Sequence, residues 1–117
     1  MKILVADDDA DIREMAIHLL GRRGWDVATV TNGEEAAEAL AADSYDIAVL
    51  DQNMPPGSGL EVAAERRLGE DAIPIILWTG WAGLIDRDET ERLDVHVVNK
   101  AEITRLAAVI EELAGVE

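Results

Sequence analysis

A short apolar run that ends in a carboxylate constrains this chain more than any other stretch. Residues 47–50, Ile-Ala-Val-Leu, lead directly into Asp51, and a Pro-Pro-Gly turn follows at residues 55–57. Four apolar residues bounded by turn residues predict a strand that is buried on both faces, as in a parallel sheet. Asp51 would then lie at the end of a buried strand, where open α/β sheets bind ligands. Taken alone, the same aspartate is equally consistent with a loop cap.

The rest of the chain repeats this succession of strand and helix. Apolar runs predict further strands, and stripes at helical spacing predict helices between them. The strands are predicted at residues 3–6, 25–30, 73–78 and 95–98, and the helices at residues 12–20, 32–40, 60–68, 84–93 and 103–114. Asp9 and Asn32 are suited to cap the first two helices. The helix at 84–93 has the weakest pattern, because it is mostly charged.

Strict alternation of strands and helices predicts an α/β fold with helices on both faces of a parallel sheet. We expect a doubly wound, five-stranded sheet of order 2-1-3-4-5, a three-layer flavodoxin-like sandwich, in one domain spanning residues 1–117. The strand order reverses between strands 1 and 3. That point brings together Asp7, Asp8 and Asp51, so the interpretation of Asp51 as a mere cap becomes the weaker one.

The composition excludes several classes of function. The formal net charge of −15 argues against a nucleic-acid surface, which needs clustered Lys and Arg, and is compatible with a cation or a basic partner. The chain has no cysteine and therefore no thiolate site. No apolar stretch is long enough to span a bilayer or to form a signal peptide. We expect a soluble, cytoplasmic domain.

Three carboxylates at one sheet edge repel each other or bind a cation. Hard oxygen ligands with room for water suit Mg²⁺, and the glycine and glutamate positions of a calcium-binding EF-hand loop are missing around Asp7, Asp51 and Asp86. A carboxylate beside such a metal can also attack phosphorus and form an acyl phosphate. Thr79 and Lys100, which follow the fourth and fifth strands, are candidates to contact the phosphoryl oxygens.

These positions together resemble the receiver domain of two-component response regulators, the CheY-like family. The similarity covers essentially the whole chain. It rests on an aspartate pair after strand 1, an aspartate after strand 3, a threonine after strand 4 and a lysine after strand 5: Asp7, Asp8, Asp51, Thr79 and Lys100. The run Asn53-Met54-Pro55 and Gly59 fit the family pattern as well.

The resemblance implies a role for each position. Asp51 would accept a phosphoryl group from a sensor histidine kinase or a histidine phosphotransfer protein. Asp8, Asp51 and the backbone carbonyl of Asn53 would bind Mg²⁺, with Asp7 acting through water. Lys100 would pair with the phosphoryl group, and Thr79 would move inward as the switch. The surface of helix 4, strand 5 and helix 5 would then recognise a downstream protein target, with the chain a monomer or a phosphorylation-dependent dimer. No catalysis beyond its own phosphotransfer and dephosphorylation is implied.

Three residues depart from the family pattern. Ala101 follows Lys100 where the family usually has a cis-proline, and a non-proline cis bond costs about 3–4 kcal/mol, so we expect a trans bond and a shifted loop. Val97 stands where many receivers carry the aromatic that rotates with the threonine. Trp81, two residues past Thr79, either borders the phosphoryl pocket or is a surface aromatic.

Two other functions remain open. The departures motivate a receiver-shaped binding module that is never phosphorylated. A small phosphatase with Asp51 as nucleophile is disfavoured, because Asn53 stands where such enzymes carry a second carboxylate. His18 and His96 have no partner in the pattern, and we expect structural or surface roles for both.

Overall fold

Five parallel strands form one sheet, in the order β2-β1-β3-β4-β5. The computed structural model describes residues 1–80 and 82–115. The strands are β1 (Lys2–Ala6), β2 (Asp26–Val30), β3 (Ile47–Leu50), β4 (Ile75–Thr79) and β5 (Val95–Asn99). Both β3 and β4 are buried along their full length, as expected of strands covered on both faces. The predicted fold class and strand order are confirmed.

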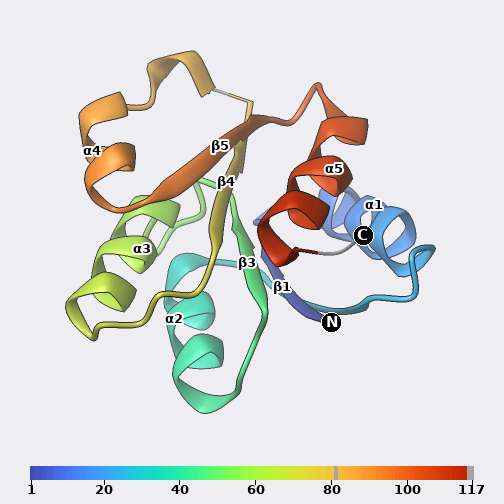
Figure 1. Cartoon of the computed structure of the whole chain (residues 1–117), viewed down its shortest axis with the longest axis horizontal. Helices are drawn as coiled ribbons and strands as arrows, with labels where there is room; N and C mark the ends of the chain where they lie inside the picture. Colours follow the sequence, from blue (N-terminus) through green and yellow to red (C-terminus); the bar gives the residue numbers. More distant parts are fainter. Residues whose placement is uncertain (81, 116–117) are drawn as a thin grey trace.

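Helices cover both faces of this sheet and complete a three-layer sandwich (Figure 1). One face carries α1 (Ala10–Gly21) and α5 (Ile103–Ala114), and the other carries α2 (Gly33–Ala42) and α3 (Gly59–Leu68), with α4 (Arg87–Arg92) beside α3. The core accordingly divides into two apolar clusters, one on each side of the sheet. Each buried strand contributes alternate residues to the two clusters, which is the periodicity that a parallel sheet requires.

The first three helices begin at side-chain caps. Asp9 accepts hydrogen bonds from the backbone N–H groups of Asp11 and Ile12 at the start of α1. Asn32 accepts from Glu35 N at the start of α2, while the Glu35 carboxylate accepts from Thr31 rather than from Asn32. The predicted capping box is therefore present with its return bond shifted by one residue.

Two segments differ from the prediction. The fourth strand begins at Ile75 rather than Ile73, because Pro74 has no N–H for the ladder and only its carbonyl pairs, with Ala48 N at 3.0 Å. The helix predicted at 84–93 is shorter. A 3₁₀ turn, η1 (Ala82–Leu84), precedes the six-residue α4, and the Leu84 side chain is exposed. Charged residues without an apolar stripe give a helix little to bury, which accounts for this short element.

Within the described residues, we find no helix with the length and apolar character needed to cross a membrane.

Candidate functional site

The sheet itself positions two of the predicted carboxylates. Asp7 and Asp51 directly follow β1 and β3. The backbone N–H of Asp7 donates to Val30 O at 3.1 Å, and that of Asp51 donates to Ala6 O at 2.9 Å, so the ladder continues past both strand ends. The two side chains are buried, with relative exposures of 1 and 8 %. Their positions follow from strand pairing and not from loop conformation.

The two buried carboxylates are oriented in the same way. One oxygen of each accepts a backbone hydrogen bond: Asp7 Oδ1 from Asp9 N at 2.9 Å, and Asp51 Oδ1 from Gln52 N at 2.8 Å. The other oxygen of each faces the Lys100 ammonium, at 2.6 Å from Asp7 Oδ2 and 3.3 Å from Asp51 Oδ2. Asp8 is exposed, and oxygens of Asp7, Asp8 and Asp51 lie within 4.8 Å of one another. The predicted convergence is confirmed.

Burial and neighbouring charges both shift the pKa values of Asp51 and Lys100. Burial, together with the neighbouring charge of Asp7, raises the pKa of Asp51 above its usual range, although Lys100 opposes the shift. Burial alone would lower the pKa of Lys100, but Asp7 and Asp51 outweigh it and hold that pKa above its usual range. Lys100 is therefore a firmly charged counter-ion for the Asp51 carboxylate, which is costly to ionise.

The donor set fits a hard divalent cation. Asp7 Oδ2 is buried and accepts no well-directed hydrogen bond, since its contact with Lys100 is an ion pair without hydrogen-bond alignment. Exposed Asp8 and buried Asp51 supply further oxygens within reach. Three carboxylates with one side open to solvent match Mg²⁺, which keeps several waters when it binds to proteins. The acidic cluster is suited to binding this metal.

Thr79 lies at the carboxyl end of β4, and Asn53 lies three residues after β3. Thr79 is the last residue of β4 and is fully buried, and its carbonyl accepts a hydrogen bond from Lys100 N at 3.1 Å. Asn53 is exposed and pairs with Ser58 in an isolated antiparallel bridge. The roles of Thr79 as a switch and of the Asn53 carbonyl as a ligand remain predictions.

Three residues that support the site were missed from the sequence. Arg13 donates from Nη1 to Asp7 O at 2.8 Å and ties α1 to the end of β1. The Gln52 side chain accepts from Leu60 N at 2.9 Å, and Asn99 Oδ1 accepts from Ala101 N at 2.9 Å. An asparagine at the start of a loop is a turn signal, and this signal was available for Asn99. The other two contacts join residues whose proximity only the fold creates.

The three departures have different outcomes. Among the described residues the only cis peptide bond is Pro55–Pro56, so the expected trans bond between Lys100 and Ala101 is confirmed. Val97 is half-buried and lines a cavity of about 290 Å³ against η1 and α4. The prediction for Trp81 lies outside the described residues.

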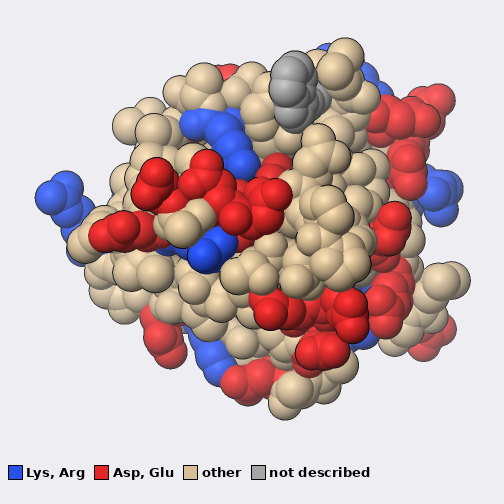
Figure 2. Space-filling model, turned by 180° about the vertical axis from the view of Figure 1, so that it is seen from behind, with Lys and Arg blue, Asp and Glu red and all other residues tan. Residues whose placement is uncertain are grey.

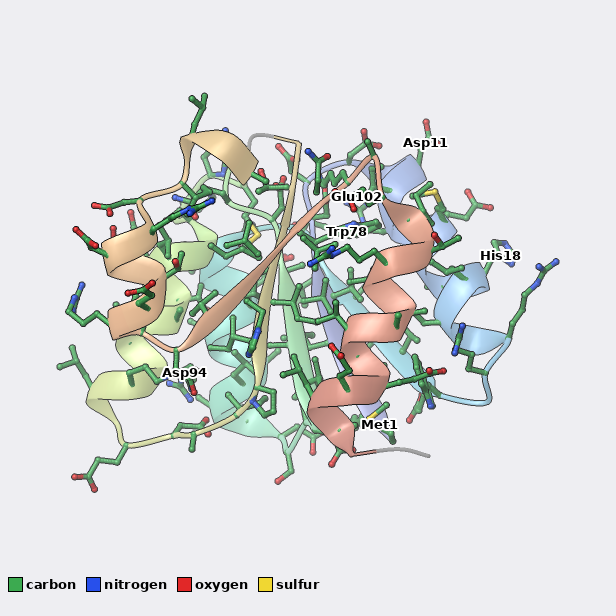
Figure 3. The ribbon with its side chains drawn as sticks, turned by 45° about the horizontal axis from the view of Figure 1, so that its top comes forward. Met1, Asp11, His18, Trp78, Asp94 and Glu102 are labelled. Atoms are coloured by element: carbon green, nitrogen blue, oxygen red, sulfur yellow. The ribbon has the colours of Figure 1, made fainter. Side chains whose placement is uncertain are left out.

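Both histidines are exposed and away from the cluster. His18 points outward from α1 (Figure 3), with a side chain 77 % exposed and 3.9 Å from Glu14. His96 is exposed on β5. These positions agree with surface roles.

The family model for the response regulator receiver domain matches residues 3–110. The chain belongs to this family: it is a receiver domain of the two-component response-regulator type.

Similar proteins agree with this assignment. The response regulator MprA of Mycobacterium avium is 38% identical over 87 residues, which cover 74% of this chain but 38% of MprA, so the match spans well under half of that relative. The crystal structure of response regulator TrrA from Thermotoga maritima, in complex with Mg²⁺-BeF, has a TM-score of 0.86 at 35% identity and covers 96% of this chain and 97% of TrrA. TrrA in complex with histidine kinase ThkA has a TM-score of 0.85 at 34% identity, with the same coverage.

Proposed function

We propose that this domain accepts a phosphoryl group on Asp51 in a Mg²⁺-dependent reaction and thereby switches a protein-binding surface. The observation that carries the proposal is the convergence of three carboxylates, two of which face one lysine, with Lys100 Nζ 2.6 Å from Asp7 and 3.3 Å from Asp51. A nucleophile, a cation for the phosphoryl oxygens and oxygens for a metal are the parts that phosphoryl transfer requires.

The proposed chemistry forms one bond and breaks one. A carboxylate oxygen of Asp51 attacks phosphorus, and the bond from phosphorus to the donor nitrogen or oxygen breaks, with its electron pair leaving on the donor. Lys100 would then turn from the carboxylates to an oxygen of the bound phosphoryl group. Water later attacks phosphorus and releases phosphate, which regenerates the Asp51 carboxylate.

Asp7, Asp8 and Asp51, with the Asn53 carbonyl, would hold the metal. Mg²⁺, when bound, supplies positive charge beside the phosphoryl oxygens and offsets the repulsion between incoming phosphate and the aspartates. The Asp7 oxygen Oδ2, which is buried and makes no well-directed hydrogen bond, supports this assignment. The hydrogen bond from Gln52 N to Asp51 Oδ1 fixes the orientation of the carboxylate.

The donor we propose is a phosphohistidine on a sensor kinase or a phosphotransfer protein. The crystal structure of TrrA with the kinase ThkA supports this choice, because TrrA matches almost the whole chain. The target would be a protein rather than a nucleic acid. Figure 2 shows acidic side chains gathered in patches on one face, with basic side chains between them, and the net charge of −15 repels phosphate backbones.

The switch we propose runs from Thr79 to the surface formed by α4, β5 and α5. Thr79 ends β4, and its carbonyl accepts a hydrogen bond from Lys100 N. The two residues proposed to contact the phosphoryl group therefore lie at the ends of neighbouring strands, β4 and β5. The cavity beside Val97 leaves space for η1 and α4 to change position.

Incubation with acetyl phosphate and Mg²⁺, followed by intact-mass measurement and peptide mapping, tests the proposal. We expect one phosphoryl group on the peptide that contains Asp51, and none in Asp51→Asn or without Mg²⁺. Unchanged labelling of Asp51→Asn would contradict the assignment. No labelling of the parent, combined with partner binding that ignores Mg²⁺, would favour the non-phosphorylated binding module. Phosphoester turnover would favour a phosphatase.

A further inference from the structure

The turn that carries Lys100 is held by a side chain that the proposed mechanism does not use. Lys100 lies in the four-residue turn 99–102 between β5 and α5. Its side chain has four flexible bonds, so the direction of the ammonium depends on how firmly the backbone beneath it is held. Figure 3 shows Glu102 at the start of α5, next to the end of β5 from which this turn leaves.

Three hydrogen bonds fix the backbone of the turn. Lys100 N donates to Thr79 O at 3.1 Å and extends the β4–β5 pairing by one residue. Glu102 N donates to Asn99 O at 2.9 Å and closes a β-turn with Lys100 and Ala101 at its centre. Ala101 N donates to Asn99 Oδ1 at 2.9 Å, which is an Asx turn inside the same segment.

The Asx turn depends on two residue choices together. Only a short side chain with an acceptor oxygen can reach the N–H two residues on, and asparagine is well suited to this. The acceptor is useful only because residue 101 has an N–H, which a proline would lack. Helix α5 gives no substitute, since its N-cap residue Glu102 makes no side-chain capping bond.

We propose that Asn99 is the positioning residue for Lys100. The Asx turn from Asn99 Oδ1 to Ala101 N holds the trans Lys100–Ala101 segment so that the ammonium reaches Asp7 and Asp51 across the sheet edge. This inference rests on the proposed function, because the group that Lys100 is positioned to contact is the phosphoryl group on Asp51.

The affinities for Mg²⁺ and for beryllofluoride, a mimic of an acyl phosphate, distinguish a role of Asn99 in positioning Lys100 from a role in general stability. Both affinities can be followed by tryptophan fluorescence, since Trp78 is fully buried with its ring centre 6.0 Å from Lys100 Nζ. For Asn99→Ala we expect beryllofluoride affinity to fall about threefold to tenfold, the equilibrium value of one hydrogen bond, with Mg²⁺ affinity unchanged. Asn99→Ser keeps a weaker acceptor and should recover part of the loss.

The matched control is Asn32→Ala, which removes an asparagine hydrogen bond of the same kind, 2.8 Å to Glu35 N, at the start of α2. We expect it to leave both affinities unchanged. Equal weakening of Mg²⁺ and beryllofluoride binding by Asn99→Ala, or no weakening at all, would overturn the role of Asn99.

A second measurement does not depend on phosphorylation. Lys2 and Lys100 are the only lysines, so trace acetylation followed by peptide mass analysis reports Lys100 with Lys2 as internal reference. Asn99→Ala should raise the ratio of Lys100 to Lys2 labelling, because a Lys100 side chain no longer held against its carboxylates is more accessible to the reagent, which reacts with the neutral amine. An unchanged ratio would overturn the inference. A raised ratio in a protein that binds no beryllofluoride would instead refute the proposed function alone.

Discussion

The two halves of the site are built by different means. The acidic half consists of Asp7, Asp8 and Asp51 at the ends of β1 and β3, and the basic half consists of Thr79 and Lys100 at the ends of β4 and β5. Sheet hydrogen bonds to Val30 O and Ala6 O fix the acidic half. The charge of the basic half is carried on the long side chain of Lys100, in the turn that follows β5.

This difference indicates a division of labour. Carboxylates fixed by the sheet form a cation site that is already assembled, at the cost of keeping buried like charges close together. A lysine on a flexible stem can leave those charges for another anion without disturbing the sheet. We therefore expect metal binding to depend on the acidic half and the response to phosphate to involve the basic half.

The largest effect should follow from removing the charge of the basic half. Lys100→Ala leaves Asp7 and Asp51 without their counter-ion, so the metal-free protein should lose about 3 kcal/mol in its free energy of unfolding. Mg²⁺ should restore much of this, and urea unfolding with and without the metal measures both effects. Lys2→Ala, which removes an exposed pair with Asp43, should cost under about 1 kcal/mol. Equal losses in the two variants would contradict the account.

Substitutions at two glycines, one near each half of the site, compare how tightly the two halves are packed. A Cβ on Gly59 would lie 2.6 Å from Leu77 Cδ2 and 2.7 Å from Asp51 O, whereas a Cβ on Gly80 would meet nothing within 4 Å. Gly59→Ala should therefore destabilise the fold by about 2 kcal/mol and weaken Mg²⁺ binding by displacing Asp51. Gly80→Ala should change stability by less than about 0.5 kcal/mol. Thermal unfolding and Mg²⁺ titration check both, and similar behaviour of the two variants would refute the contrast.

Arg67 anchors the C-terminal end of α4, at the opposite end of β5 from Lys100, and offers a way to loosen α4 alone. Its guanidinium donates to Leu93 O at 2.7 Å, Asp71 O at 2.7 Å and Asp94 O at 3.2 Å. Arg67→Lys keeps the charge but loses the fork, so stability should fall by about 1.5 kcal/mol. Amide exchange in α4 should quicken while Mg²⁺ affinity stays constant.

Arg92→Lys is the control for that substitution, because the ion pair that Arg92 makes with Glu89, at 3.9 Å, is exposed on α4. It should change stability by less than about 0.5 kcal/mol. Weaker Mg²⁺ binding in Arg67→Lys would show that the two halves are not separable.

The smallest effect concerns the charge of Asp51 itself. Burial and the charge of Asp7 raise the pKa of Asp51 in the folded protein. The stabilising contribution of this group to the free energy of unfolding is therefore fully present below the ordinary pKa of an aspartate, and it is lost as the pH rises through the raised value. Asp51→Asn should therefore stabilise the metal-free protein by about 1 kcal/mol at neutral pH. The difference should vanish in acid, as chemical denaturation at several pH values would show. A benefit that persists in acid would point to a cause other than charge.

The acidic half was predictable from the sequence, whereas among the contacts that support β5 and the turn after it only Asn99 carried a local signal. Apolar runs that end in Asp7 and Asp51 fix strand ends, and parallel pairing brings such ends to one edge. Helix α4 was predicted too long, because charged residues carry almost no periodic signal. Arg67 reaches Leu93 and Asp94 only after α3 and α4 have packed, and no local pattern encodes such a contact.

Backbone amide NMR shifts during titration test the division of the site most directly. Mg²⁺ is added first, and beryllofluoride follows at saturating Mg²⁺. The account predicts that Mg²⁺ shifts resonances around Asp7, Asp8 and Asp51 while those of β5 and α4 stay in place. Beryllofluoride should then move Thr79, Asn99, Lys100 and α4, and Asp51→Asn should abolish that second step. Movement of β5 and α4 by Mg²⁺ alone, or a beryllofluoride response confined to β1 and β3, would contradict it.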